Sequence, residues 1–388
     1  MLIKNADVIL ADEVARQSVA IQGTTITGLG PDLQDAGDEV LDARGFFLSP
    51  GFIDLHMHAG YLGPQYDIQG ELILCAQNLP KNGTTRWLCT LISALSGDLP
   101  GLFDEIRDFQ AAGIPGAQPL GVHIEGPYIS KHARGGFRPN QITTPSEFSL
   151  DPTLDAGAGL VKIVSLAPEL PGTDEVIRDC RRRGIVVGMC HTKAGENEYL
   201  RARAAGATHI THCYNNRRDF PNSPLGGRGF NLDDLGVADD TMSCELICDG
   251  HHVKPVWVKT IYRVKGSNGI CLVSDSFLAG GRYAEGQTFR SGDGALIAVR
   301  DGVGRDEHGA LCGSVITLDR AVKIFIDIAG ASLTEAVRCA SLNPARVLGL
   351  QAEYGSIAVG KVADLVLLDA DLVPVVAFVA GRMVFDRR

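Results

Sequence analysis

The stretch GIVVGMCHTKAGENEYLRARAAGATHITH, residues 184–212, decides the fold class. In it, two apolar, β-rich runs that each end in a histidine flank a helix-like segment. Eight such runs occur in the central part of the chain, each ended by a polar residue: GFIDLH (51–56), TTRWLCT (84–90), LGVHIE (120–125), VKIVSLAPE (161–169), GIVVGMCH (184–191), ATHITH (207–212), TMSCELICD (241–249) and GICLVSD (269–275). Apolar strands alternating with helices indicate a parallel sheet covered on both faces, and eight in a row predict an α/β fold of the (β/α)₈ TIM barrel type. An open doubly wound sheet is the alternative, but no G-x-G-x-x-G follows the first run to support it.

The two ends of the chain have a different pattern. Residues 1–50 contain short alternating or β-branched runs punctuated by Gly, Asp and Pro, and three or four similar runs follow Gly355. Neither end could bury much surface alone, and chain termini that flank an inserted body usually lie close together. We therefore expect residues 1–50 and 351–388 to form one small β-sandwich domain beside a barrel domain of residues 51–350.

Composition narrows the class of protein. A hydrophobic content of 45% with 21% charged residues is that of an ordinary globular protein, and the net charge of -10 argues against a broad nucleic-acid or anionic-membrane surface. The N-terminal stretch has neither a signal-peptide core nor a spanning segment, so we expect a cytoplasmic location. The ten cysteines form no paired CxxC pattern, which predicts buried reduced thiols.

The residues that end the eight runs carry the chemistry. Active sites of (β/α)₈ barrels lie at the carboxyl ends of the strands. The residues found there, or just after, are His56, His58, Glu125, His191, His212, His252 and Asp275. Imidazole nitrogens and carboxylates are ligands of divalent metal ions, and His56 and His58 share one face of an extended strand. A lone histidine is more often structural. Here, however, five of the ten histidines end predicted strands or follow them closely, and this coincidence favours a metal site.

The ordered set of motifs resembles the N-acetylglucosamine-6-phosphate deacetylase family, within the amidohydrolase superfamily. The motifs span nearly the whole chain: PGFIDLHMH (50–58), HIEGPYIS (123–130), LAPE (166–169), GATHITHCYN (206–215), DGHHV (249–253), LVSD (272–275), LCGSVITLDRAV (311–322), NPARVLGL (343–350) and GSIAVGKVADLVLLD (355–369). The glutamate that ends the third strand is the specific feature of this set. The chain has no G-x-S-x-G elbow that would support a serine nucleophile instead.

The resemblance implies a role for each of these residues. Glu125, His191 and His212 would hold one divalent metal ion, Zn, Fe or Mn, and His56 and His58 with Glu125 as a bridge could hold a second, so one or two ions are expected. Asp275 and His252 would be catalytic, Asp275 as the general base that later protonates the leaving amine and His252 by polarising the acyl carbonyl. The substrate-binding residues expected are Gly136, Asn215, Asn216, Arg228, His252 and Leu311. The family precedent also implies a homodimer.

The family's phosphate-binding residues are replaced in this sequence. Phe137 stands where the family has a histidine, and Ser223 stands where it has an arginine that a neighbouring subunit donates. Arginines in the same two loops could take over phosphate recognition, since a guanidinium fork suits phosphate or carboxylate; the alternative is that most are ordinary surface charges. They are Arg134, Arg138, Arg217, Arg218 and Arg228.

The sequence therefore predicts a hydrolase that removes the acetyl group from an N-acetyl amino sugar, with an N-acetylhexosamine 6-phosphate as the first choice of substrate. Two alternatives stay open. One is an amidohydrolase that acts on another N-acyl compound or a cyclic amide. The other is a barrel protein without catalytic activity, since a fold alone does not establish function.

Overall fold

The computed structural model describes residues 1–34, 39–58, 67–95, 99–215, 230–277, 285–290, 296–309 and 311–388. Its centre is a sheet of eight parallel strands, hydrogen-bonded in chain order. The strands are β6 (Phe52–Met57), β7 (Thr84–Ile92), β8 (Gln118–Glu125), β9 (Val161–Leu166), β10 (Val186–Met189), β11 (His209–Ile210), β12 (Ser243–Ile247) and β13 (Ile270–Val273). The first and last strands meet where the Asp275 N–H donates to His56 O (2.8 Å) and the His58 N–H to Ser276 O (2.9 Å). The predicted (β/α)₈ barrel is confirmed, and each of the eight runs overlaps one strand.

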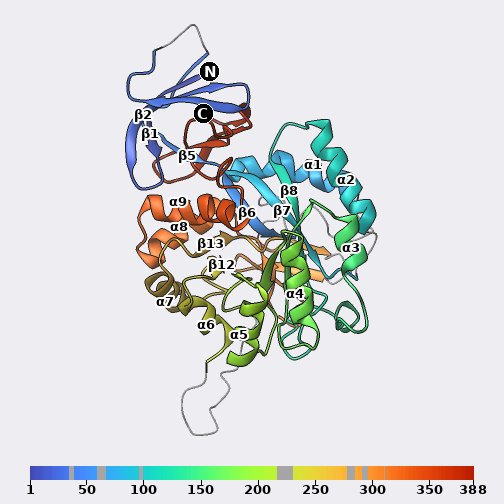
Figure 1. The fold of residues 1–388 in the computed structure, drawn as a ribbon. Helices are drawn as coiled ribbons and strands as arrows, with labels where there is room; N and C mark the ends of the chain where they lie inside the picture. Colours follow the sequence, from blue (N-terminus) through green and yellow to red (C-terminus); the bar gives the residue numbers. More distant parts are fainter. Residues whose placement is uncertain are drawn as a thin grey trace.

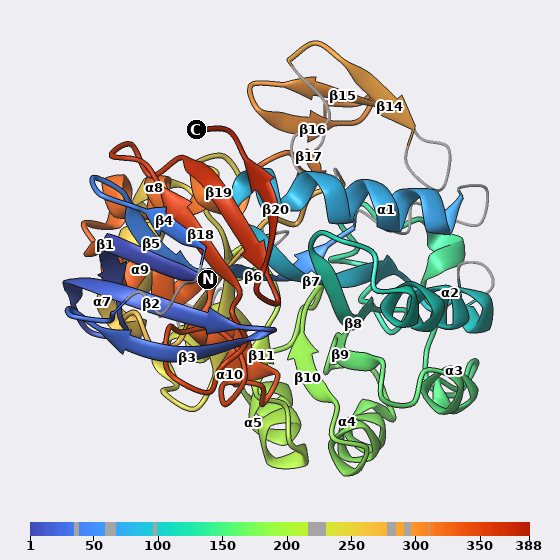
Figure 2. The ribbon, with the colours of Figure 1, turned by 90° about the horizontal axis from the view of Figure 1, so that it is seen from above.

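Helices surround the barrel (Figures 1 and 2). They are α1 (Ile68–Asn78), α2 (Leu99–Ala112), α3 (Asp151–Ala156), α4 (Thr173–Arg182), α5 (Glu196–Ala205), α6 (Leu232–Ala238), α7 (Pro255–Lys265), α8 (Leu318–Ala329), α9 (Leu333–Ala340) and α10 (Leu342–Val347), with short 3₁₀ turns at Leu79–Asn82 and Pro139–Gln141. α8 shows why these segments fold onto the barrel: it buries Leu318, Ala321, Val322 and Phe325, which share one face at helical spacing. Among the described residues, no helix has the length and apolar character needed to cross a bilayer.

Strands from both ends of the chain join in one eight-stranded sheet, seen at the top of Figure 1 in blue and red. Its strands are β1 (Leu2–Ile9), β2 (Val14–Gln22), β3 (Thr25–Gly30), β4 (Val40–Asp42), β5 (Phe47–Pro50), β18 (Leu365–Leu368), β19 (Pro374–Val379) and β20 (Arg382–Asp386). The order is β20-β19-β18-β5-β1-β2-β3, with β4 beside β1. The predicted pairing of the two ends is confirmed, and the strands share a core that includes Ile3, Val19, Leu48, Leu365 and Phe378.

A buried ion pair connects this terminal sheet to the barrel. Arg86 of β7 donates from Nε to Asp364 Oδ2 (2.6 Å) and from Nη2 to Asp364 Oδ1 (3.0 Å), and Asp364 directly precedes β18. The two side chains are only 9% and 6% exposed. The Arg86 guanidinium also lies over the Tyr354 ring, 4.8 Å from its centre.

A four-stranded antiparallel sheet follows the last barrel strand, and the sequence analysis did not predict it (Figure 2). It consists of β14 (Thr288–Arg290), β15 (Leu296–Arg300), β16 (Val303–Arg305) and β17 (Leu311–Ser314). β17 returns to the barrel, where the Ser314 N–H donates to Asp275 O (2.8 Å) and the Ser314 hydroxyl donates to Ser274 O. The prediction for the cysteines holds for the nine whose side chains are described, all of which are buried and outside any disulfide.

Candidate metal centre and active site

Six of the residues predicted from strand ends converge at one end of the barrel. His56 lies in β6, Glu125 ends β8, and the other four follow strands β6, β10, β11 and β13: His58, His191, His212 and Asp275. Each of the six is at most 5% exposed. The backbone at His191, His212 and Asp275 adopts φ values of 43°, 31° and 48°. That left-handed conformation costs a non-glycine residue about 1–3 kcal/mol, so the surrounding structure must impose it.

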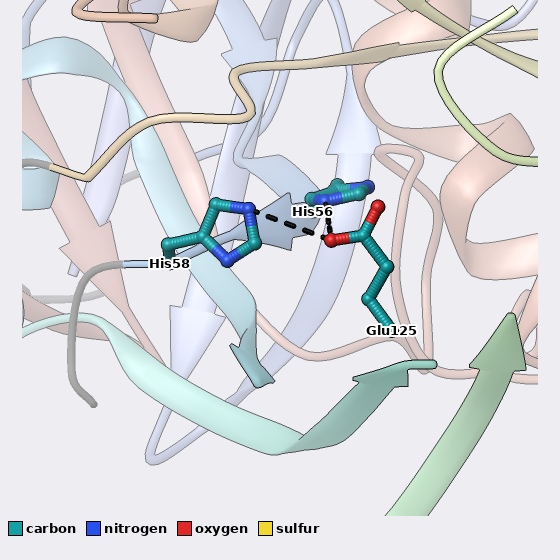
Figure 3. Close-up of side chains that lie close together, drawn as sticks. All are labelled: His56, His58 and Glu125. Carbon is teal, nitrogen blue, oxygen red and sulfur yellow. Dashed lines mark ion pairs between the residues drawn. The ribbon is translucent and has the colours of Figure 1, made fainter. Parts of the chain in front are cut away.

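The Glu125 carboxylate divides the histidines into two groups. Its Oε1 lies 2.7 Å from His212 Nε2 and 3.1 Å from His191 Nε2. Its Oε2 lies 3.7 Å from His56 Nε2 and 3.8 Å from His58 Nε2, as the dashed lines in Figure 3 show. One carboxylate thus presents one oxygen to each pair of imidazoles, which is the arrangement of a bridging ligand between two metal ions.

Three of the four histidines have their outer ring nitrogen hydrogen-bonded to an acceptor. His191 Nδ1 lies 3.0 Å from Ala133 O, and His58 Nδ1 lies 3.2 Å from Thr90 O. His56 Nδ1 lies 2.9 Å from Glu245 Oε2. Because these oxygens only accept, the Nδ1 atoms carry the protons and the Nε2 lone pairs point inward.

The inward-facing atoms fit a divalent cation. His56 Nε2 is buried and has no hydrogen-bond partner among the described residues, and His191 Nε2 lies only 3.1 Å from His212 Nε2. When both nitrogens are unprotonated their lone pairs repel one another, and a bound cation would remove this repulsion. Nitrogen and carboxylate donors suit zinc and the neighbouring transition metals. The ligand atoms of His56, His58 and Glu125, and those of Glu125, His191 and His212, lie within 4.8 Å of one another.

Both carboxylates of the centre remain ionised. Burial raises the pKa of Glu125, but the neighbouring imidazoles of His191, His212 and His56 outweigh burial and hold this pKa well below its ordinary value. Burial likewise raises the pKa of Asp275, and the neighbouring imidazoles of His56 and His58 bring it below its ordinary value. Asp275 Oδ1 lies 3.0 Å from His58 Nε2 and 3.5 Å from His56 Nε2, beside the second group.

A layer of buried polar side chains lies inside the barrel next to the centre, and the sequence analysis did not single it out. Its members are His123, Ser165, His209, Thr211 and Glu245, none of them measurably exposed. His123 Nε2 lies 2.7 Å from Ser165 Oγ, which lies 2.7 Å from Thr211 Oγ1. A signal was available for Glu245, because a glutamate inside an apolar strand is almost never fully buried without partners.

His252 lies in the loop after β12, where Asp249 fixes it. Asp249 Oδ2 lies 2.6 Å from His252 Nδ1, and Asp249 Oδ1 accepts the backbone N–H groups of His251 and His252. Burial raises the pKa of Asp249, but the bond with His252 outweighs it and holds this pKa below its ordinary value. His252 Nδ1 is therefore committed to Asp249, which leaves Nε2 for other contacts.

Three of the expected substrate-binding residues lie in different parts of the described chain. Gly136 is exposed in the loop after β8, half-buried Asn215 donates its N–H to His212 O (3.0 Å), and Leu311 begins β17. The remaining predictions, with the arginines of the loop after β11, lie outside the described residues: Asn216, Arg217, Arg218, Ser223 and Arg228.

Phe137 contacts the predicted metal ligand His191 directly. Its ring meets the His191 ring edge to face, with centroids 4.9 Å apart, and it packs in a small core with Ile129 and Cys190. The Arg134 guanidinium donates to the Phe137 carbonyl oxygen. The position at which the family has a histidine is thus used here for apolar packing against a predicted metal ligand.

Comparison with known proteins places this geometry in a family. The model of the amidohydrolase family matches residues 47–386. N-acetylglucosamine-6-phosphate deacetylase of Bacillus subtilis is 31% identical over 99% of this chain and 97% of its own length, and N-acetylgalactosamine-6-phosphate deacetylase of Escherichia coli O157:H7 is 31% identical over 84% of both chains. The crystal structure of the N-acetylglucosamine-6-phosphate deacetylase of Thermotoga maritima superposes with a TM-score of 0.84, at 31% identity over the full length of both chains. The chain belongs to the amidohydrolase family and, within it, to the N-acetylglucosamine-6-phosphate deacetylase family.

Proposed function

We propose that this chain is a metal-dependent deacetylase of an N-acetylhexosamine 6-phosphate. The observation that carries the proposal is the bridging position of Glu125 between two pairs of inward-facing imidazoles. The related chains named for deacetylation of amino-sugar phosphates support it. In this proposal Glu125, His191 and His212 hold one divalent ion, and His56, His58 and Glu125 hold a second. When bound, such an ion activates water at neutral pH and polarises the acyl carbonyl.

Asp275 and His252 would carry the proton transfer and the orientation of the substrate. The ionised Asp275 carboxylate can take a proton from the attacking water and return it to the departing amine, and general acid–base catalysis of this kind contributes about 10²- to 10⁴-fold in rate. His252, oriented by Asp249, would contact the acyl carbonyl from Nε2. The general base and the leaving-group acid would thus be one residue.

The experiment that tests the proposal is a deacetylation screen of N-acetylglucosamine, N-acetylgalactosamine and N-acetylmannosamine, each with and without 6-phosphate, together with N-acyl amino acids. We expect the phosphorylated sugars to be preferred. The relatives include enzymes named for the glucosamine and the galactosamine epimers, so both are primary candidates. If acetate is released from none of the phosphorylated sugars, the proposal is contradicted.

Phe137 favours a second candidate substrate class within the same chemistry. An apolar ring stands where the family has a phosphate-binding histidine, so another N-acyl compound or a cyclic amide is the alternative. Arg228 separates the two. If Arg228 binds phosphate, Arg228→Ala should lower kcat/KM for the phosphorylated sugar by about 10- to 100-fold, because one charge-assisted hydrogen bond is lost. The kcat/KM for the neutral sugar should stay unchanged. Equal turnover of neutral and phosphorylated sugars, unaffected by Arg228→Ala, would favour the alternative.

Four further properties stay predictions. They are the identity of the metal as zinc, iron or manganese, the homodimer, the cytoplasmic location, and the division into a domain of residues 1–50 with 351–388 and a barrel domain of residues 51–350. Elemental analysis and sedimentation test the first two. The terminal sheet has a hydrophobic cluster of its own, which supports the last, and its Ile9, Val366, Leu368 and Ala377 pack in the cluster of the barrel.

A further inference from the structure

Glu245 lies at the middle of β12, is fully buried, and contacts both halves of the metal centre. Its Oε2 accepts from His56 Nδ1 at 2.9 Å and from the His212 backbone N–H at 3.0 Å. Its Oε1 accepts from His209 Nε2 at 3.0 Å, and the other ring nitrogen of His209 lies 2.7 Å from Ser243 Oγ. Three donors therefore surround this one carboxylate, and two of them belong to histidines on opposite sides of Glu125.

Glu245 acts differently on the two histidines. For His56 it accepts the Nδ1 proton, which keeps the Nε2 lone pair directed at Glu125 and Asp275. Without this acceptor, the proton could move to Nε2 and occupy the position of the metal. For His212 it holds the backbone N–H of a residue whose φ is 31°, a conformation that needs outside support. The His212 ring has its own contact with Glu125, so Glu245 affects its position less directly.

Glu245 is not itself arranged as a metal ligand, although its carboxylate lies within 4.8 Å of ring nitrogens of His56 and His123. Its two oxygens already accept from three donors. His123 Nδ1 lies 3.1 Å from Leu55 O and His123 Nε2 lies 2.7 Å from Ser165 Oγ, so both ring nitrogens have partners. Hydrogen bonds thus satisfy this third group, whereas the Nε2 atom of His56 has none to any residue that the structure describes.

We propose that Glu245 is a positioning residue that orients His56 for the second metal ion and links the two halves of the centre through His212. The inference rests on the metal centre of the proposed function, and it adds a carboxylate outside the ligand set. The hydrogen bond between His56 and Glu245 connects residues 189 positions apart in the chain.

The test is Co²⁺ titration of the chelator-treated full-length protein, with the number of ions bound, the affinity for each and the visible absorption of the bound cobalt as readouts. The wild-type chain should bind two equivalents. In Glu245→Leu, the affinity for the second ion should fall by about 10- to 100-fold, the usual cost of removing such a partner, and more than the affinity for the first. Glu245→Gln should restore most of it, because its carbonyl oxygen can still accept from His56 and His212.

Two further variants keep the test decisive. Glu245→Asp keeps the charge but draws the carboxylate back by one methylene, so it should also lower the affinity for the second ion. This variant still tests the inference if Glu245→Leu fails to fold. Ser243→Ala is the matched control: it lies two residues away on β12 and contacts His209 but none of the predicted ligands, so both ions should bind normally. Circular dichroism of the metal-free proteins verifies that each variant is folded.

Wild-type affinity for both ions in Glu245→Leu and Glu245→Asp would overturn the inference, as would a single ion in the wild-type chain or an equal loss in Ser243→Ala. Failure of the proposed function gives a different result. In that case the wild-type chain binds two Co²⁺ ions and Glu245 variants lose the second, but no N-acetylhexosamine 6-phosphate is deacetylated.

Discussion

Asp275 is the carboxylate of the cluster that contacts only one pair of histidines, so its replacement should separate proton transfer from metal binding. Asp275→Asn keeps the volume and an acceptor oxygen but cannot take a proton. We expect kcat to fall by at least about 10², the lower end for loss of a general acid–base group. Metal content and circular dichroism should match the wild-type protein. Near-normal turnover would assign the proton transfer to another group.

His191 and His58 contact opposite oxygens of Glu125, and their variants should differ in metal content. His191→Ala should release the ion held by Glu125 and His212, whereas His58→Ala should release only the second ion. Elemental analysis after dialysis gives the equivalents bound, which we expect to lie between one and two in the wild-type protein. Unchanged metal content in both variants, with activity indifferent to chelation, would exclude the proposed centre.

The sequence identifies residues at strand ends better than residues inside strands. His56, Glu125, His191, His212 and Asp275 could be selected because the carboxyl ends of parallel strands meet at one face of a barrel. Glu245, His123 and His209 lie within apolar runs, and their partners come from distant strands. Whether such a side chain is structural or positions a ligand depends on contacts that a linear pattern does not encode.

At the scale of the element, β17 supports the active end of β13 through a glycine. Gly313 has φ 59°, and a Cβ built there would lie 2.2 Å from the Phe277 ring and 3.0 Å from Asp275 O. Phe277 stacks on His58 with ring centroids 4.9 Å apart. A side chain at Gly313 must therefore displace Phe277, and with it the region of His58 and Asp275.

Gly313→Ala should lower kcat by up to about 10²-fold, the effect of misplacing reactive groups by about 1 Å. Gly309→Ala is its control: that glycine also has a positive φ, 78°, but a Cβ there would meet nothing within 4 Å. The control should incur only the left-handed backbone cost of about 1–2 kcal/mol and keep its turnover. Steady-state kinetics and thermal unfolding of the two variants make the comparison, and equal kcat values would show that β17 does not hold the site.

The elements that the sequence predicted are those with strong periodicity. All eight barrel strands overlap apolar runs and bury most of their side chains, as in β6 and β7. The sheet of β14 to β17 escaped prediction although its strands, three to five residues long, are no shorter than β10 to β13. Charged residues and glycine, such as Arg300, Asp301, Gly302 and Arg305, interrupt this segment and keep its apolar runs short.

At the scale of the whole molecule, loss of the buried Arg86–Asp364 pair between barrel and terminal sheet should lower the free energy of unfolding strongly. Arg86→Met leaves the Asp364 carboxylate buried without its partner, which costs about 3–5 kcal/mol in the free energy of unfolding. The exposed pair of Arg16 and Asp7 is the control, with side chains 56% and 31% exposed, and Arg16→Met should cost at most about 1 kcal/mol. Urea unfolding measures both, and equal losses would contradict the prediction.

The sequence also predicted that the two ends of the chain pair, because each end carries strand patterns but too little apolar surface for a core of its own. The sequence did not establish which residues contact the substrate. Phe137 is buried against His191, so its replacement of the family histidine changes the packing around a predicted ligand as well as the contact with phosphate. Such a change depends on neighbours in space, and the sequence shows only the exchanged residue.

The position of β5 has a consequence for biosynthesis. This strand lies between β1 and β18, parallel to the first and antiparallel to the second. The ribosome releases β1 and β5 early, but β18 only after the whole barrel has been made, a delay on the order of tens of seconds at about 5–20 residues per second. During that time one edge of β5 lacks its neighbour, and an open strand edge can pair with other chains. A nascent chain of this protein should therefore need protection from aggregation until its last strands emerge.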